Sequence, residues 1–334
     1  MSGAVATTEG DMVDRRYSLR REIGRGGACV VHEAVHRITR RVVAVKRLLP
    51  SHQDDQVLRA RLFREAEAIA AINHPNVVHA LDAGEDEGGR PYIVLEYVDG
   101  RSLEGLVAAR GVLRPPDALH IVREICGAVA AVHDAGFAHR DVKPSNVLVL
   151  AGAGYDDLTN ARVKLIDFGI ATAPRFDAAR KLTREHTVIG TLEYMPPERV
   201  LGESDASAGA GDIYGVGATL FECLTGRVPF EGDAVQIVAQ LTTRPPPTVQ
   251  SLRPEVPYLV EPLLEKALHR DPRVRYPDVR SLERALTAAL ESLSKAPAGV
   301  GASRRLHVRA PYITPVRVEE GSRTLDGRTE DLSA

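Results

Sequence analysis

Two short segments near the middle of the chain carry residues that suit the transfer of a charged group. Residues 139–146 read His-Arg-Asp-Val-Lys-Pro-Ser-Asn, and the triplet Asp-Phe-Gly follows at 167–169. Phosphoryl transfer develops negative charge on oxygen atoms, so it needs groups that bind divalent cations and a carboxylate that positions the nucleophile. The carboxylates of Asp141 and Asp167 and the amide of Asn146 are such groups. The order and content of the two segments are strongly specific for this chemistry.

A lysine and a glutamate closer to the N-terminus would complete the candidate site. Lys46 follows the apolar run Val43-Ala44-Val45, and Glu65 lies 19 residues further on, within a predicted helix. An ion pair between these two side chains would direct the ammonium group towards the phosphates of a nucleotide. In isolation, each residue is better explained as an ordinary solvated side chain. Their interpretation therefore depends on the two segments above.

Residues 24–31, Gly-Arg-Gly-Gly-Ala-Cys-Val-Val, lie between two predicted strands. A dinucleotide-binding glycine turn leads into a helix, so this context excludes that site. Glycines in a hairpin allow its backbone to approach phosphates closely, although a simple hairpin turn explains the segment equally well. Within it, Cys29 has two interpretations. Backbone donors there would lower the pKa of a reactive thiol, or Cys29 is an inert small residue, which we favour.

The surrounding sequence predicts the elements that must position these residues. Alternating β-branched strands are predicted around residues 18–48, with one helix at 60–72 and a strand at 92–98. Beyond this point the apolar spacing becomes helical, and only two short strands, NVLVL and RVKLI, interrupt it. We therefore expect an N-terminal extension (1–16), an N-lobe (17–97), a C-lobe (98–293) and a flexible C-terminal tail (294–334).

Composition narrows the class of protein. The 334 residues carry 43 Lys and Arg against 45 Asp and Glu, and this net charge of −2 argues against a nucleic-acid partner. The longest stretch free of these residue types is 68–81, too short to span a membrane. The acidic N-terminus does not resemble a signal peptide, and three distant cysteines fit free thiols, so we expect a cytoplasmic protein.

Together with residues 190–198 (GTLEYMPPE) and 212–217 (DIYGVG), these motifs resemble the eukaryotic-like protein kinase family, specifically the bacterial serine/threonine kinases, over residues 17–293. The resemblance implies an α+β bilobal protein kinase fold. Its N-lobe would be a small antiparallel sheet with one helix, and its C-lobe would be larger and helical.

The resemblance also implies roles for individual residues. Asp141 would orient the substrate hydroxyl and accept its proton, Asn146 and Asp167 would bind Mg²⁺ or Mn²⁺, and Lys46 with Glu65 would position ATP. Lys143, together with Thr191, is typical of the serine/threonine class. The predicted nucleotide contacts are Ile23, Gly24, Arg25, Gly26, Gly27, Ala28, Cys29, Val30, Val31, Ala44, Lys46, Glu96, Val98 and Leu148.

Further expectations concern architecture and activation. Glu198 is expected to pair with Arg275, and Asp212 to bind the backbone of the catalytic loop. Because Arg140 precedes Asp141, the resemblance implies an activation segment ordered by a phosphothreonine, for which Thr183 and Thr187 are the candidates.

The predicted function is that of an ATP-dependent serine/threonine protein kinase, with protein substrates and a transient homodimer for phosphorylation of its own activation segment. The alternative is a pseudokinase, a nucleotide-binding signalling module without phosphotransfer. Loss of Lys46, Asp141, Asn146 or Asp167 would favour it, and all four are present. Small-molecule kinases of the same fold are disfavoured, because they lack the segment that begins at Gly190.

Overall fold

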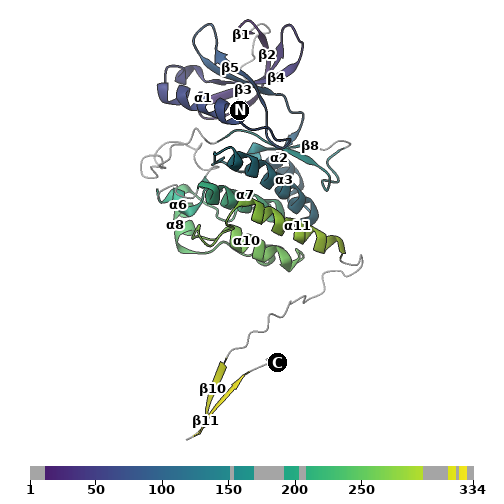
Figure 1. Cartoon of the computed structure of the whole chain (residues 1–334), viewed down its shortest axis with the longest axis vertical. Coiled ribbons are helices and arrows are strands. Elements are labelled where there is room, and N and C mark those ends of the chain that lie inside the picture. The colour runs from purple at the N-terminus through teal and green to yellow at the C-terminus, as the bar shows by residue number, and fades with distance from the viewer. Residues whose placement is uncertain are drawn as a thin grey trace. The chain divides into compact units, whose positions relative to one another are not determined.

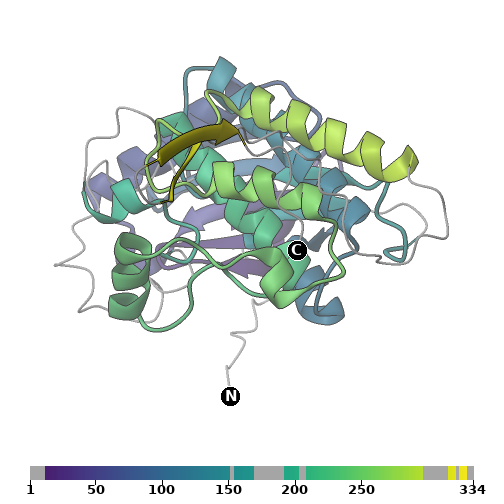
Figure 2. The ribbon, with the colours of Figure 1, turned by 90° about the horizontal axis from the view of Figure 1, so that it is seen from below.

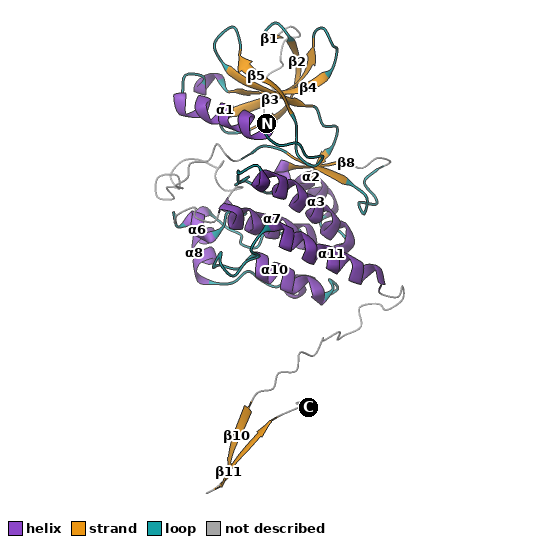
Figure 3. Cartoon of the chain, viewed as in Figure 1, coloured by secondary structure: helices purple, strands orange, loops and turns teal. Residues whose placement is uncertain are grey.

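The computed structural model describes residues 12–150, 154–168, 192–202 and 208–295, and the two strands 315–320 and 323–328. Residues up to 296 form one compact unit. Within this unit a strand-rich lobe stands above a helical one, as Figures 1 and 3 show. The predicted α+β class and the division into two lobes are confirmed.

The N-lobe contains a six-stranded antiparallel sheet with the strand order β1-β2-β3-β4-β6-β5. Its strands are β1 (Met12–Val13), β2 (Tyr17–Arg25), β3 (Cys29–His36), β4 (Val42–Leu48), β5 (Ala80–Glu85) and β6 (Pro91–Glu96). Side chains alternate between the two faces of β4. Val43 and Val45 belong to a small outer core, whereas Ala44 and Leu48 belong to the main core. This alternation places Lys46 on the inner face, together with Ala44.

One long helix, α1 (Gln56–Ala70), packs against this sheet. Its buried residues include Leu62, Ala66 and Ile69, which recur at helical spacing. The helix begins four residues before the predicted start at residue 60, because the side chain of Asp55 accepts hydrogen bonds from the backbone of Val57 and Leu58. It ends two residues before the predicted end at 72.

The C-lobe is built around α3, whose apolar residues are almost all buried. Helices α7 and α11 pack on α3, and the contact between α3 and α11 is visible in Figure 2. The α-helices that the structure describes in this lobe are α2 (Leu103–Arg110), α3 (Pro115–Asp134), α6 (Pro197–Val200), α7 (Ala208–Thr225), α8 (Ala234–Thr243), α9 (Val249–Leu252), α10 (Glu261–Ala267) and α11 (Val279–Lys295). Short 3₁₀ turns lie at η2 (Pro144–Asn146) and η5 (Tyr258–Val260) in this lobe, and at η1 (Pro50–His52) between β4 and α1 in the N-lobe.

A second, three-stranded sheet lies where the lobes meet. Its strands are β7 (Arg101–Ser102), β8 (Val147–Leu150) and β9 (Arg162–Leu165), in that order. Strand β9 also bonds to the N-lobe: the Val78 N–H donates to the Leu165 carbonyl at 3.1 Å, and the Leu165 N–H donates to the Asn76 carbonyl at 2.8 Å. These backbone bonds fix the position of one lobe against the other.

Residues 297–334 form a second compact unit. It contains an antiparallel pair of strands, β10 (Pro315–Glu320) and β11 (Arg323–Arg328), which the composition of this segment did not predict.

Candidate active site

Lys46, Glu65 and Asp167 come from three separate elements and meet in one cluster. Lys46 lies on β4, Glu65 on α1, and Asp167 two residues beyond β9. The Lys46 ammonium group donates to Glu65 Oε1 at 2.7 Å and to Asp167 Oδ1 at 2.9 Å. The ion pair that the sequence predicted between Lys46 and Glu65 is therefore present. It joins the sheet to α1, and Asp167 joins both to the C-lobe.

The charges of Lys46 and Asp167 stabilise each other. Burial alone would lower the pKa of Lys46, but the Asp167 and Glu65 carboxylates outweigh it and raise that pKa above the ordinary lysine value. The Lys46 ammonium group in turn lowers the pKa of Asp167. Burial raises the pKa of Glu65, although Lys46 opposes that rise. Lys46 is therefore a cation and Asp167 an anion at neutral pH.

Within the segment 139–146, the side chains of Lys143 and Asn146 both contact the carboxylate of Asp141. The Asn146 amide nitrogen donates to Asp141 Oδ2 at 2.9 Å and to the Asp141 carbonyl at 2.8 Å. The Lys143 ammonium group lies 2.9 Å from the same Oδ2. Both neighbours bind Oδ2 of Asp141, and among the described residues Oδ1 has no hydrogen-bond donor.

Asp212, on α7, supports this loop from beneath, as the sequence predicted. Its carboxylate accepts the backbone N–H groups of His139 at 2.8 Å and Arg140 at 2.6 Å. Arg140 has a φ of 66°, in the left-handed region that costs energy for a side chain with a Cβ. Gly215, one turn further along α7, allows the helix to approach the loop, because a Cβ there would lie 2.8 Å from the Val142 carbonyl oxygen.

Phe168 and His139 connect the loop to the end of β9. Their rings lie 4.8 Å apart, and the Ile166 N–H donates to the Asn146 carbonyl at 2.9 Å. Burial lowers the pKa of His139, so its ring is neutral at pH 7. These contacts connect the segment that carries Asp167, whose φ is 53°, to the segment 139–146.

The glycine-rich segment forms the hairpin between β2 and β3. Gly24 pairs with Val31, and Arg25 with Val30. The Gly26 N–H donates to the carbonyl of Cys29 at 2.8 Å, and the Ala28 carbonyl accepts the Leu49 N–H. Gly27 lies between them at the exposed tip, and Ile23 is 39% exposed on β2. Gly26 and Gly27 therefore lie in the turn of the hairpin, whereas Gly24 belongs to strand β2.

The other predicted nucleotide contacts surround the junction of the lobes. Ala44 pairs with Leu95 across β4 and β6. Val98 follows β6, and Leu148 lies half-buried on β8. The Glu96 N–H already donates to the His79 carbonyl, at 3.0 Å. The Glu96 N–H is thus committed to this internal bond.

Lys164 is a residue at this junction that the sequence analysis missed. Its ammonium group donates to the Val77 carbonyl at 3.0 Å and pairs with the Glu96 carboxylate. The same Glu96 oxygen accepts the His79 N–H at 2.9 Å. The only sequence signal was a lysine inside the short apolar strand RVKLI. Its partner is 68 residues away, which local patterns do not reveal.

The predicted pair of Glu198 and Arg275 is confirmed. The two side chains form a bidentate ion pair with both N···O distances at 2.7 Å. Gly169, Gly190, Thr191, Thr183 and Thr187 lie outside the described residues.

Cys29 carries the first testable prediction. Burial raises the pKa of its thiol to about 11, which opposes the reactive thiolate and favours the inert interpretation. We expect iodoacetamide at pH 8 to alkylate Cys29 about tenfold more slowly than glutathione, because the lower thiolate fraction outweighs the higher intrinsic nucleophilicity. Peptide mass spectrometry over time measures the rate. Alkylation as fast as that of glutathione would contradict the expectation.

Comparison with known proteins agrees with the geometry. A family model described as a protein kinase domain matches residues 17–285. Serine/threonine-protein kinase PrkC of Bacillus subtilis is 36% identical over 284 residues, 85% of this chain and 42% of the relative. Serine/threonine-protein kinase PknB of Mycobacterium tuberculosis is 40% identical over 275 residues, 81% of this chain and 42% of the relative. The chain thus spans about two-fifths of the length of these curated relatives.

Solved structures give the same result. The crystal structure of the Mycobacterium tuberculosis PknI kinase domain matches with a TM-score of 0.65 and 27% sequence identity, covering 85% of this chain and 99% of that one. Within the described part of the chain, none of the helices combines the length and the apolar composition needed to cross a bilayer. The chain therefore belongs to the protein kinase family, among the eukaryotic-like serine/threonine kinases of bacteria.

Proposed function

We propose that the chain is an ATP-dependent serine/threonine protein kinase that transfers the γ-phosphoryl group of ATP to hydroxyl groups of proteins. The observation that carries the proposal is the cluster of Lys46, Glu65 and Asp167, opposite the loop with Asp141 and Asn146. These residues supply a cation for phosphate, carboxylate and amide oxygens for metal ions, and a carboxylate for the nucleophile.

Each residue has a role in this proposal. Asp141 Oδ1, the oxygen left by Lys143 and Asn146, accepts the hydrogen bond of the substrate hydroxyl and then its proton. Lys46 binds the α- and β-phosphates, and Glu65 holds its ammonium group in place. The glycine hairpin covers the phosphates with backbone N–H donors.

The donor set fits Mg²⁺ or Mn²⁺, both of which prefer oxygen ligands. The Asp167 carboxylate is ionised, and its side chain is 41% exposed. The Asn146 amide nitrogen donates to Asp141, which turns the amide oxygen away from that residue. Asp167 and Asn146 would therefore be the metal ligands, and the bound metal would neutralise charge on the phosphate oxygens.

Specificity for serine and threonine is proposed on the basis of Lys143, which contacts Asp141 Oδ2 from within the loop. The relatives named as serine/threonine-protein kinases support this class. A cytoplasmic location of the chain, protein substrates and a transient homodimer for autophosphorylation are part of the same proposal. The pseudokinase alternative is weaker, because the residues whose loss defines it are all present, with Lys46 bound to Asp167 and Asn146 bound to Asp141.

The proposal is tested by incubating the purified chain with labelled ATP and Mg²⁺ or Mn²⁺, alone and with a generic basic protein substrate. We expect label on serine and threonine residues, mapped by mass spectrometry. Binding of ATP without label transfer under either metal would favour the pseudokinase. Label on tyrosine alone would contradict the serine/threonine assignment.

The activation segment carries a prediction of its own. Replacing both Thr183 and Thr187 by alanine is expected to lower turnover at least several-fold, because a phosphothreonine there would pair with Arg140. Turnover of the double variant and of phosphatase-treated wild type is measured on one substrate. Full activity in the double variant, with no phosphate found on residues 170–189 of wild type, would refute the switch and leave the kinase proposal intact.

A further inference from the structure

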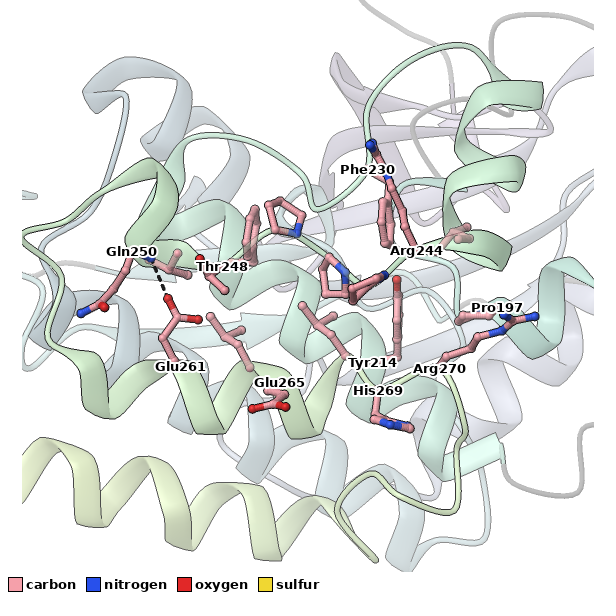
Figure 4. Close-up of a pocket in the computed structure, with 18 of the residues that line it drawn as sticks. Pro197, Tyr214, Phe230, Arg244, Thr248, Gln250, Glu261, Glu265, His269 and Arg270 are labelled. Atoms are coloured by element: carbon pink, nitrogen blue, oxygen red, sulfur yellow. Dashed lines mark hydrogen bonds between the residues drawn. The ribbon is translucent and has the colours of Figure 1, made fainter. Parts of the chain in front are cut away.

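The C-lobe contains a hollow that is separate from the candidate active site, which we call the C-lobe groove. It has a volume of about 730 Å³ and is lined by residues of α6–α10 and their loops, as Figure 4 shows. None of its lining residues belongs to the predicted catalytic or nucleotide-binding set. A second hollow of about 400 Å³ adjoins it, since Arg244, Pro245 and Pro247 line both.

The groove is apolar and has a stiff wall. Its lining includes Phe230 and Leu264, which are buried, and Tyr258, which is 58% exposed. Three consecutive prolines, residues 245–247, line the groove, and Pro245 and Pro247 also line the second hollow. Proline fixes its own φ and has no N–H, so this wall is rigid and presents carbonyl groups as its polar atoms. A preformed apolar groove of this kind suits the binding of an apolar segment.

Tyr214 adds an unusual polar group. Its side chain lines the groove and is only 1% exposed, and its hydroxyl has no hydrogen-bond partner among the described residues. The Arg275 guanidinium lies 5.1 Å from its ring centroid, so the ring is fixed in position. Buried hydroxyl groups nearly always have a partner. At 1% exposure the side chain forms part of the floor of the groove, and the exposed charges provide the recognition features of the groove.

Charges of opposite sign lie towards opposite ends of the groove, as Figure 4 shows. Arg244 and Arg270 are both exposed, and neither forms an ion pair with another described residue. Glu261 and Glu265 lie towards the other end, where Glu261 accepts the Gln250 N–H at 2.6 Å. Glu265 is exposed and has no partner within the described part of the chain. The complementary occupant is acidic at one end and basic at the other.

We propose that the C-lobe groove docks an extended segment of the protein substrate, with acidic residues at one end, apolar residues in the middle and basic residues at the other end. The inference rests on the proposed kinase function and names a substrate class for it. An extended peptide can carry charges of opposite sign at its two ends with apolar side chains between them, which matches the charges and the apolar lining of the groove. A substrate segment that binds in the groove keeps the substrate hydroxyl near the active site and so raises the local concentration of that hydroxyl. The chemical step itself is unchanged.

The test compares a short phosphoacceptor peptide with the same peptide joined by a Gly/Ser linker to a docking segment of this pattern. We expect the KM of wild type to be at least about tenfold lower for the tethered peptide, with kcat unchanged. When Gly and Ser replace the apolar centre of the tethered segment, we expect KM to return to the value of the untethered peptide. Equal KM values for all three peptides would overturn the proposal.

Charge variants locate the effect. In Arg270→Glu, we expect that tethering the bipolar segment no longer lowers KM. A tethered segment with basic residues at both ends should lower the KM of this variant in part. Arg284→Glu, an equally exposed change on α11, serves as the matched control and should keep the wild-type lowering of KM. All variants should phosphorylate the untethered peptide equally. A loss in Arg284→Glu equal to that in Arg270→Glu would contradict docking in the groove.

A binding measurement separates this proposal from the kinase proposal. Fluorescence anisotropy of the labelled bipolar segment needs no turnover, and we expect Arg270→Glu to weaken its binding about tenfold. Binding without any label transfer would refute the kinase function and leave the groove as a peptide site. Label transfer without binding of this segment would refute docking alone.

Discussion

Asp141→Asn is expected to lower turnover by at least about 100-fold while leaving the protein folded. The carboxylate of Asp141 is the proposed proton acceptor, and an amide at this position cannot accept a proton from a hydroxyl group. The contacts from Asn146 and Lys143 both reach Oδ2, so an amide oxygen at that place preserves them. Initial rates at saturating ATP measure the effect, and thermal unfolding checks the fold.

Lys46→Met serves as the companion variant, because it removes a different part of the same mechanism. It deletes the ammonium group that contacts Glu65 and Asp167, so phosphate binding should fail even though Asp141 is intact. Lys46 and Glu65 are both buried, and some loss of stability is expected from the unpaired Glu65 carboxylate. Wild-type turnover in either variant, with the fold intact, would show that the roles are assigned wrongly.

The sequence predicted the parts of the fold that follow from local patterns. The apolar residues of α11 recur at helical spacing and form one buried stripe, so the pattern itself is the signal. Strand β4 and helix α3 are buried on nearly all sides, and their signal is a dense run of apolar residues. The sequence analysis did not delimit helix α8 within the helical region, although a signal for its start existed. Asp233 and Gln236 form a capping box at its start, and that spacing is readable in the sequence.

Most of the candidate site was predictable because Asp141, Asn146 and Asp167 lie within short motifs of fixed order. Lys46 and Glu65 were predicted only in combination with those motifs. Asp141, Lys143 and Asn146 share one loop, so their contacts depend on local backbone geometry. The Lys164–Glu96 pair and the C-lobe groove were not predictable in this way. Both depend on how elements that are distant in the sequence pack together, and no local pattern encodes that packing.

Removal of Arg275 is expected to have the largest effect on stability. Its guanidinium is buried and donates five hydrogen bonds: two to the Glu198 carboxylate and one each to the carbonyls of Ala210, His269 and Arg270. Arg275→Met leaves the Glu198 carboxylate and these carbonyls without their partner. Breaking a buried ion pair from one side costs about 3–5 kcal/mol of unfolding free energy, which urea denaturation measures.

A double-mutant cycle distinguishes the ion pair from the packing of the arginine stem. Glu198→Gln removes the charge of the partner but keeps its size, and Arg275 retains its three carbonyl acceptors, so this variant should lose less stability than Arg275→Met. In the combined variant no carboxylate is left unpaired, and its loss should therefore be clearly smaller than the sum of the two single losses. Additive losses would mean that the pair contributes no coupling. Arg275 would then stabilise the C-lobe through its carbonyl contacts and its position against Tyr214 alone.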